Sequence, residues 1–448
     1  MIKSIVEVCI KRKHDDIIER VHDFITINHP FISPGTISFS SDAFLTEYVH
    51  KITIDIPSQY SDSKIPLSTL NLEIMTYLLV DADVEDCVIA EESDEVTAFH
   101  SWSLPCRQLE GMWESLILPP SIKPLLLSYS QASLFLSEKK VDTSLVSCNR
   151  LILLHGVPGT GKTTLCKGLA QKLAIRMSKQ FSDAQLVVVN AHSLFSKWFS
   201  ESGKLVSKMF EQIREMCEDG IFVCVLVDEV ESLSASRTAA LAGSEPSDAI
   251  RVVNAVLTEL DKLSKFSNCL ILATSNITKA VDEAFLDRAD LTITLPRPGS
   301  EARQQIIQGC LDELRSRGIF SDFLSPHMGS SGIDSSSASP HAMKRRSITS
   351  QLSHEAHRVL DILQKYPEIQ LSKDRRLHLE HKAEESTMDV FMAEVVDVTE
   401  GLSGRFLRKL PLMTLSKIMA HTGQTTVPEE VFILFMIICA EDRVKEKH

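Results

Sequence analysis

The sequence predicts an α/β fold, a parallel sheet flanked by helices, preceded by a small α+β domain and followed by a helical lid. Apolar segments of strand length alternate with amphipathic helical segments across residues 101–298. One of these strands runs into a glycine-rich loop ending in Lys-Thr, and a helical pattern follows at once. Residues 299–448 are mainly helical in pattern, whereas residues 1–100 mix strand and helix signals without a regular alternation. We therefore expect three domains with these boundaries.

The first block, residues 1–100, mixes strand and helix signals. Lys51–Ile56 alternates apolar and polar residues as a half-buried strand does, whereas Asp15–Asn28 has a looser helical pattern. The acidic stretch Glu91–Glu95 is typical of an exposed loop. Because the block contains no recognisable catalytic constellation, we expect a binding or recruitment module.

The second block contains five predicted strands and ends at two prolines. Pro296 and Pro298 end the alternating pattern, and the lid follows. Within the lid, residues 325–350 are rich in Ser, Gly and Pro, a composition that predicts a disordered insert. This insert contains Lys344–Ser347, a basic patch that is open to reading as a kinase site, a nuclear-import signal or neither. The predicted strands are Arg150–Leu154, Gln185–Asn190, Phe222–Val227, Cys269–Ala273 and Leu291–Leu295.

Composition limits the classes of protein that fit. With 44% hydrophobic and 24% charged residues, the 448-residue chain is typical of a soluble globular protein. Its net charge of −13 argues against a dedicated nucleic-acid binder, although a local basic groove is compatible with that balance. The apolar run Val431–Ala440 falls short of the roughly 20 residues of a membrane span and predicts a buried terminal helix.

Ten cysteines are scattered from Cys9 to Cys439 without a C-x-x-C pair or a zinc-ligand spacing. The residues after Met1 do not resemble a secretory signal. We therefore expect reduced, mostly buried thiols in a cytosolic or nuclear protein.

The glycine-rich loop is a phosphate-binding P-loop, G-x-x-x-x-G-K-[ST], in its expected strand–loop–helix context. Its glycines let backbone N–H groups turn toward phosphates, and the following helix presents its positive end. Lys162 is expected to reach the β- and γ-phosphates, and the Thr163 hydroxyl to ligate Mg²⁺. A glycine-rich turn matching by chance is the alternative. The predicted nucleotide-binding residues are Gly156, Val157, Pro158, Gly159, Thr160, Gly161, Lys162, Thr163 and Thr164.

An acidic pair, Asp228-Glu229, follows the strand Phe222–Val227. Downstream of a P-loop, this pattern is typical of a Walker B motif, in which Asp228 holds Mg²⁺ through water and Glu229 polarises the attacking water. Two helix-capping carboxylates are the alternative. Asn276 follows the next strand, where its amide would help to position the water, although Asn is also common in turns for local reasons.

In this order, the P-loop, the acidic pair, the strand-end asparagine and the lid resemble an AAA+ ATPase across residues 105–448. Finer matches are similar to the pachytene checkpoint protein 2 family, AAA+ remodellers of HORMA-domain proteins. These matches are Asn149–Gly156, Ser193–Lys204, Asp287–Asp290 and Gly401–Arg405.

The resemblance implies a homo-hexameric, Mg-ATP-dependent ring whose N-terminal domain recruits the HORMA substrate and a possible HORMA-like adaptor. It implies work in meiotic synapsis, recombination and checkpoint control, in the nucleus and cytoplasm, without direct nucleic-acid or membrane binding.

Four further residues take roles from the resemblance. Trp198 and Phe199 match a pore loop that grips polypeptide by non-directional contact, the alternative being core aromatics of a helix. Arg288 matches the arginine finger given to the neighbouring subunit, with Arg297 as the fallback and an ion pair to Asp287 or Asp290 as the alternative.

Arg405 matches the lid residue that senses the nucleotide, the alternative being an ordinary charged residue at a helix start. Val157 departs from the family pattern, which has proline there, and we expect little effect on binding because the position contributes stiffness rather than a ligand. Two other functions remain open: a nucleotide-gated scaffold with little hydrolysis, and an AAA+ motor acting on another polymer.

Overall fold

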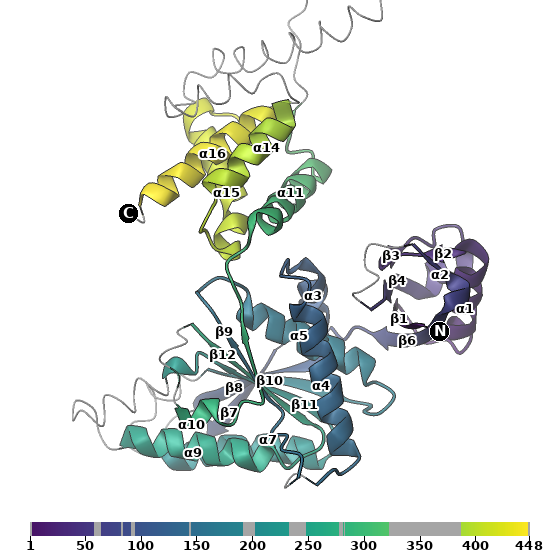
Figure 1. Cartoon of the computed structure of the whole chain (residues 1–448), viewed down its shortest axis with the longest axis vertical. Helices are drawn as coiled ribbons and strands as arrows, with labels where there is room; N and C mark the ends of the chain where they lie inside the picture. The colour runs from purple at the N-terminus through teal and green to yellow at the C-terminus, as the bar shows by residue number, and fades with distance from the viewer. Residues whose placement is uncertain are drawn as a thin grey trace, which may run out of the picture. The chain divides into compact units, whose positions relative to one another are not determined.

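The computed structural model describes residues 2–57, 64–81, 84–90, 95–142, 145–190, 202–232, 248–276, 281, 283–321 and 387–446. The chain forms two compact units, Met1–Pro296 and Arg297–His448 (Figure 1). Their division lies at the proline-marked break in the sequence. The expected pore-loop residues Trp198 and Phe199 and the serine-rich insert lie outside the described residues.

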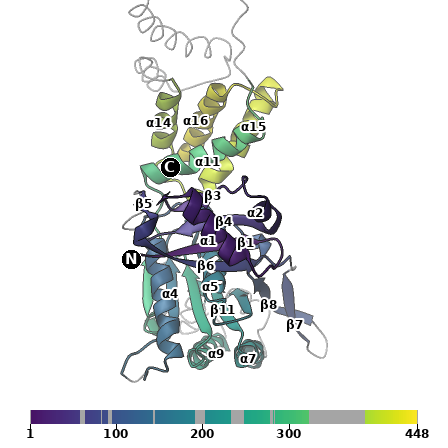
Figure 2. The same ribbon diagram turned by 90° about the vertical axis from the view of Figure 1, so that its right-hand side faces the viewer.

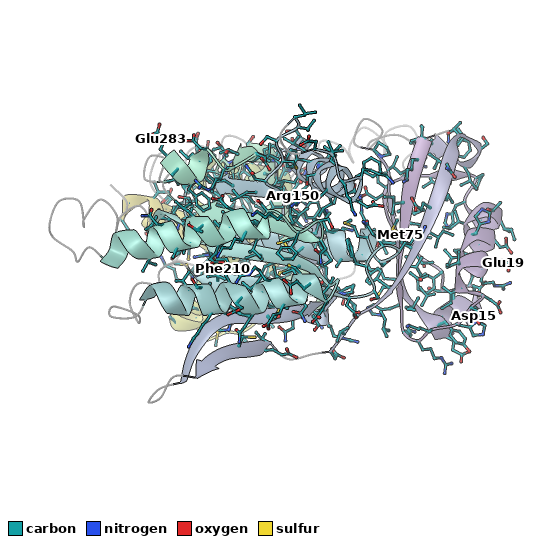
Figure 3. The ribbon with its side chains drawn as sticks, turned by 90° about the horizontal axis from the view of Figure 1, so that it is seen from below. Asp15, Glu19, Met75, Arg150, Phe210 and Glu283 are labelled. Carbon is teal, nitrogen blue, oxygen red and sulfur yellow. The ribbon has the colours of Figure 1, made fainter. Side chains whose placement is uncertain are left out.

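An N-terminal α+β domain opens the first unit and faces the viewer in Figure 2. Its four-stranded sheet has the order β3-β4-β1-β6, in which β1 is antiparallel to β4 and parallel to β6. The apolar sides of α1 and the strands enclose a core that includes Val8, Val21, Ile25 and Ile52. In Figure 3, Asp15 and Glu19 lie on the outer side of this domain. Met75 lies on the side of β6 that faces the second, seven-stranded sheet of the same unit. The elements are β1 (Ile2–Ile10), α1 (Ile17–Asn28), β2 (Phe31–Ile32), β3 (Gly35–Ile37), α2 (Ala43–Tyr48), β4 (Val49–Asp55), β5 (Ile65–Pro66) and β6 (Leu70–Leu78).

A seven-stranded sheet of order β13-β9-β12-β11-β10-β8-β7 forms the centre of the first unit. All five strands expected from the sequence are present and run parallel to one another. Two antiparallel strands, β7 and β8, extend it at one edge. The expected domain boundary at residue 100 falls inside β8, because the pattern of β8 resembles that of the preceding block. The strands are β7 (Glu85–Ala90), β8 (Glu95–Leu104), β9 (Leu151–His155), β10 (Ala184–Asn190), β11 (Phe222–Asp228), β12 (Cys269–Ser275) and β13 (Leu291–Thr294).

Helices cover both faces of this sheet (Figure 1). Successive side chains of a strand point to opposite faces, so Leu151 and Leu153 pack with α7 and α9, whereas Ile152 and Leu154 pack with α4 and α5. Burial on both faces explains why these strands are continuous apolar runs. The helices are α3 (Met112–Ser115), α4 (Ile122–Glu138), α5 (Lys162–Arg176), α7 (Ser202–Glu218), α9 (Asp248–Leu263) and α10 (Glu283–Leu286).

The second unit is helical, as expected for the lid. Helix α16 contains Val431–Ala440, all of it buried, which confirms the terminal core helix. Among the described helices, none combines the length and hydropathy needed to cross a membrane. All ten cysteines lie in the described ranges as free thiols, and most are buried. The helices are α11 (Ser300–Ser316), α14 (Thr387–Val398), α15 (Gly404–Thr422) and α16 (Glu429–Lys445).

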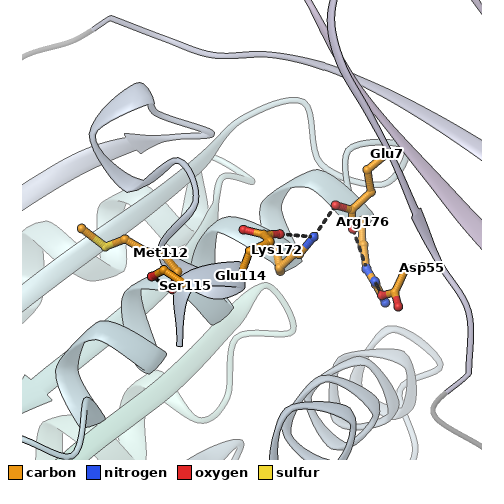
Figure 4. A network of polar contacts seen from close by, with 7 residues as sticks. All are labelled: Glu7, Asp55, Met112, Glu114, Ser115, Lys172 and Arg176. Carbon is orange, nitrogen blue, oxygen red and sulfur yellow. Dashed lines mark hydrogen bonds and ion pairs between the residues drawn. The ribbon is translucent and has the colours of Figure 1, made fainter. Parts of the chain in front are cut away.

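A buried ion network joins the C-terminal half of α5 to the N-terminal sheet (Figure 4). The Lys172 ammonium contacts the Glu7 carboxylate from β1 and, at 2.9 Å, the Glu114 carboxylate from α3. The Arg176 guanidinium contacts Glu7 at 3.2 Å and also Asp55 from β4. Burial by itself lowers the pKa of Lys172, but the carboxylates of Glu7 and Glu114 outweigh it and raise that pKa above its ordinary value. The network therefore keeps its lysine charged inside the protein.

Candidate nucleotide site

The P-loop connects β9 to α5 and needs its glycines for two different reasons. Gly156 has φ +150°, and a Cβ there would lie 2.3 Å from the carbonyl oxygen of Leu295, so only glycine fits beside β13. Gly161 has φ +94° and caps the N-terminus of α5 in a left-handed conformation. The loop therefore leads directly into the N-terminus of α5. The first N–H groups of a helix have no partner within the helix, so they are available to an anion.

Lys162, the first residue of α5, is buried within the loop. Its ammonium donates hydrogen bonds to the carbonyl oxygens of Gly156 at 2.7 Å and Val157 at 3.1 Å. Burial lowers the pKa of His155 at the end of β9 below its ordinary value, and the nearby Lys162 charge lowers it further. The His155 ring contacts the Thr294 hydroxyl at 2.9 Å, which ties β9 to β13 beside the loop. The site therefore carries its positive charge on the lysine.

The P-loop and the end of β11 meet at Thr163 and Asp228. The Thr163 hydroxyl donates to the two carboxylate oxygens of Asp228 at 3.0 and 3.2 Å. The Thr274 hydroxyl, from the neighbouring strand β12, donates to the same carboxylate. Hydroxyl and carboxylate oxygens are the ligands that Mg²⁺ prefers, so this pair fits the ion.

Glu229 follows Asp228 in an uncommon backbone conformation. Its φ is +61°, a region that costs a non-glycine residue of order 1 kcal/mol. Its N–H donates to Thr274 Oγ1 at 3.2 Å, and the next N–H, of Val230, donates to the Thr274 carbonyl at 3.0 Å. Thr274 therefore holds both members of the acidic pair, one through its carboxylate and the other through its backbone.

Asn276, just beyond the end of β12, is held by a second glutamate. Its backbone N–H and its side-chain Nδ2 donate to the same oxygen, Oε1 of Glu231, at 3.1 and 2.9 Å. Because β11 and β12 are parallel neighbours, the residues after their carboxyl ends meet at one edge of the sheet. The structure thus brings together the P-loop, the acidic pair and the asparagine that the sequence predicted for one site.

Arg288 lies away from this cluster, between α10 and β13. Its guanidinium forms a bidentate ion pair with Asp261 of α9, at 2.7 and 2.8 Å, and donates to the Ala284 carbonyl at 2.7 Å. Among the described residues, the carboxylate that pairs with Arg288 is therefore Asp261, and not Asp287 or Asp290 as the sequence suggested. Asp290 instead accepts the N–H groups of Asn149 at 3.1 Å and Leu151 at 3.3 Å, which fixes the start of β9.

The two remaining arginine candidates belong to the second unit. Arg405 is exposed in the first turn of α15, which is capped by the Ser403 side chain accepting from the Phe406 N–H at 3.3 Å. Arg297 donates to the carbonyl of Gly401 in the turn before that helix. These contacts describe the helix start and assign neither residue to the nucleotide.

Comparisons with known proteins agree with this geometry. Residues 152–297 match the family described as ATPase family associated with various cellular activities (AAA). The chain is 40% identical over 419 residues to the pachytene checkpoint protein 2 homolog of Arabidopsis thaliana, covering 91% of this chain and 82% of that protein. It is 37% identical over 440 residues to the Homo sapiens homolog, covering 97% and 91%. The chain belongs to the pachytene checkpoint protein 2 family.

A solved structure supports the same membership in three dimensions. The structure of Caenorhabditis elegans PCH-2 matches with a TM-score of 0.69 and 30% identity, covering 99% of each chain. The family and the AAA+ fold predicted from the sequence are therefore confirmed. Membership in an AAA ATPase family implies that the chain binds a nucleotide and has ATPase activity.

Sequence reasoning missed three partners of the predicted residues: Thr274 and Glu231 in the site, and Asp261 beside Arg288. Thr274 stands inside an apolar strand, where a β-branched residue is ordinary. Glu231 lies near a pair of acidic residues that already explains the motif. Asp261 is one of several charged residues in the sequence of α9. The signal available in the sequence was the polar hydroxyl of Thr274 in a strand whose other residues up to that point are apolar.

Proposed function

We propose that this chain hydrolyses Mg-ATP and uses the energy to remodel HORMA-domain proteins. The residues of the P-loop, Gly156 to Thr164, would bind the phosphates, with Lys162 neutralising the charge of the β- and γ-phosphates. Thr163 and Asp228 would hold Mg²⁺, which when bound would screen the phosphate charge. The Thr163–Asp228 contact supports this assignment, since it places two oxygen ligands side by side at the helix N-terminus.

Glu229 and Asn276 would orient the attacking water. Glu229 is held in a costly left-handed conformation by its bond to Thr274, and such strain is typical of residues whose direction matters to function. A carboxylate that accepts the water's proton raises its nucleophilicity, and an amide beside it fixes the angle of attack.

A homo-hexameric ring would complete the site between subunits. Arg288 of one subunit would stabilise the transition-state charge on the neighbour's nucleotide, which is worth about 10³–10⁵ in rate in related systems. Arg297 is the fallback for this role, and Arg405 would report the nucleotide state to the lid. For Arg288, its exposed fraction of 30% supports the proposal, and its ion pair with Asp261 would have to open for this role.

The substrate assignment follows from the family. Trp198 and Phe199 would grip an extended segment of a HORMA-domain protein and pull it into the pore, partly unfolding it. The N-terminal domain would recruit that substrate, directly or through a HORMA-like adaptor. The setting would be meiotic synapsis, recombination and checkpoint control, in the nucleus and cytoplasm, without direct binding of nucleic acid or membrane.

One observation carries the proposal most: the P-loop threonine and the β11 aspartate are in direct contact, with Glu229 held next to them. The test compares wild type with Glu229→Gln, which keeps the shape of the side chain and removes the base. We expect the variant to bind ATP as wild type does and to lose steady-state hydrolysis by a factor of about 100 or more. Equal background rates in both proteins would contradict an ATPase.

The same variant tests the substrate. Held in the ATP state, Glu229→Gln should retain its substrate during affinity purification from cell extract, and mass spectrometry should identify a HORMA-domain protein. Trp198→Ala added to Glu229→Gln is the matched control, because it removes the gripping aromatic without touching the nucleotide residues. Recovery of tubulin or DNA-associated partners in place of HORMA proteins would favour another polymer as the target.

A further inference from the structure

Asn276 is tied to Glu231 by two hydrogen bonds to a single oxygen. The backbone N–H of Asn276 lies 3.1 Å from Glu231 Oε1, and its side-chain Nδ2 lies 2.9 Å from the same atom. One bond fixes the main chain just after β12, and the other fixes the torsion of the side-chain amide. The carboxylate therefore determines both the position and the rotation of the Asn276 amide.

The chemistry of a carboxylate makes this contact directional. An ionised carboxylate only accepts hydrogen bonds, whereas an amide has a donor end and an acceptor end of nearly the same shape. Facing Glu231, the Asn276 amide must present its NH₂ group, so its Oδ1 atom is turned away from the carboxylate. One N–H and the Oδ1 atom then remain for a phosphate oxygen and a water.

The second oxygen of the same carboxylate argues against a purely structural role. Glu231 Oε2 is buried and has no hydrogen-bond partner among the described residues. Leaving a buried acceptor unpaired costs stability, and an apolar side chain of similar size would avoid that cost. A glutamate at this place is therefore poorly explained by folding alone.

The position of Glu231 is itself set by the site. The Val230 N–H donates to the Thr274 carbonyl at 3.0 Å, which anchors the chain after Glu229 against β12. The same threonine holds Asp228 and the Glu229 backbone through its hydroxyl. Any displacement of Asn276 is thus shared with the segment that carries the acidic pair.

We propose that Glu231 is a positioning residue for ATP hydrolysis, which holds the Asn276 amide with its donor end toward the carboxylate and its acceptor end toward the attacking water. This inference rests on the proposed ATPase function and deepens it. Glu231 touches neither the nucleotide nor the water in this role and acts through Asn276.

The experiment measures basal ATPase and ATP affinity of the full chain carrying Glu231→Met, Glu231→Gln, Asn276→Ala and the Glu231→Met/Asn276→Ala pair. Methionine keeps the volume and removes the acceptor, so we expect kcat to fall about 10- to 100-fold while the Kd for ATP changes less than about twofold. Glutamine can still accept from both N–H groups but also fits the flipped amide, so its kcat should lie between wild type and Glu231→Met. Glu211→Gln, an exposed glutamate on α7, is the control and should match wild type.

The double variant decides whether Glu231 acts through Asn276. If it does, Glu231→Met should lower kcat no further once Asn276 is alanine. A kcat that falls by the product of the two single effects would overturn the proposal, as would a Glu231→Met protein that hydrolyses ATP at the wild-type rate.

Two further measurements keep the outcome interpretable. Melting temperatures within a few degrees of wild type should accompany the loss of kcat, since removing the unpaired oxygen compensates for the lost bonds. Failure of the ATPase proposal itself appears differently, as background hydrolysis by wild type. If wild type hydrolyses ATP and Glu231→Met hydrolyses it at the same rate, only the inference about Glu231 is contradicted.

Discussion

The two ends of α5 each bury a lysine and surround it differently. At the N-terminal end, Lys162 donates to carbonyl oxygens of the P-loop. At the other end, Lys172 lies between the carboxylates of Glu7 and Glu114. At 1.5 Å per residue, the two positions are about 15 Å apart along the helix. One helix therefore carries two buried positive charges with opposite kinds of partner.

The two lysines differ in how far their charge is neutralised by the protein. Backbone carbonyls bear only partial charge, so the Lys162 end keeps a net positive field that a triphosphate can use. The Lys172 end is neutralised within the protein by carboxylates from β1 and α3, two elements distant in the chain. The first arrangement suits the binding of an anion, and the second suits the attachment of one domain to another.

The largest expected effect comes from breaking the neutralised end. Glu7→Gln removes the carboxylate that both Lys172 and Arg176 contact, and Glu7 is only 2% exposed. Loss of one partner of a buried ion pair costs about 3–5 kcal/mol, so we expect the free energy of unfolding to fall by that amount. Urea unfolding followed by circular dichroism measures it, and the Kd for ATP should stay within about twofold of wild type.

A matched control is the exposed pair that Glu73 makes with Lys3 and Lys179 at 2.9 and 2.8 Å. Glu73→Gln should cost no more than about 1 kcal/mol, because exposed ion pairs contribute little. If Glu7→Gln weakened ATP binding as strongly as it weakened folding, the two ends of α5 would be coupled rather than separate.

The next effect in size comes from the anion-binding end. Lys162→Met removes a charge-assisted contact worth about 1.5–3 kcal/mol, so we expect ATP affinity to fall about 10- to 150-fold. Fluorescent-nucleotide titration measures the Kd, with the exposed Lys208→Met on α7 as the control. An unchanged Kd would show that the lysine charge is not what the nucleotide uses.

The smallest effect concerns pH at the neutralised end. Burial by itself raises the pKa of Glu114, but the Lys172 ammonium outweighs it and lowers that pKa below its ordinary value of 4.5. A depressed carboxylate pKa stabilises the fold above the unfolded value and loses that contribution as pH falls through the folded value. Because the Glu114 side chain is 43% exposed, we expect less than about 1 kcal/mol.

Glu114→Gln isolates this contribution. The melting temperature of wild type should exceed that of the variant at about pH 6, and the difference should shrink as the pH falls below 4.5 and through the lowered pKa of the folded state. A difference that persisted unchanged at the lower pH would assign the effect to packing rather than to charge.

Much of the nucleotide site could be predicted because its parts are local in the sequence. Gly156 and Gly161 are required by backbone conformation and by the closeness of β13, so a pattern of glycines marks the loop before any fold is known. Asp228 and Asn276 follow apolar strands, and parallel strands bring their carboxyl ends to one edge. The strands themselves were predictable because burial on both faces makes them continuous apolar runs.

The partners of these residues could not be predicted. Asp261 reaches Arg288 from α9, where the sequence suggested Asp287 or Asp290. Strands β7 and β8 join the large sheet although their alternating pattern resembles the domain before it. In both cases the local pattern fits several arrangements, and packing selects one of them.

The sequence by itself determined the fold class and the glycine-rich loop, because backbone conformation and strand burial impose local residue patterns, and its motifs carried the resemblance to the family. Only the tertiary structure decided that Thr274 holds the acidic pair, that Glu231 orients Asn276 and that Lys172 meets Glu7. The last two residues are separated by 165 positions in the chain. Contacts of this kind depend on which surfaces the folded domains bring together, and no local spacing in the sequence encodes them.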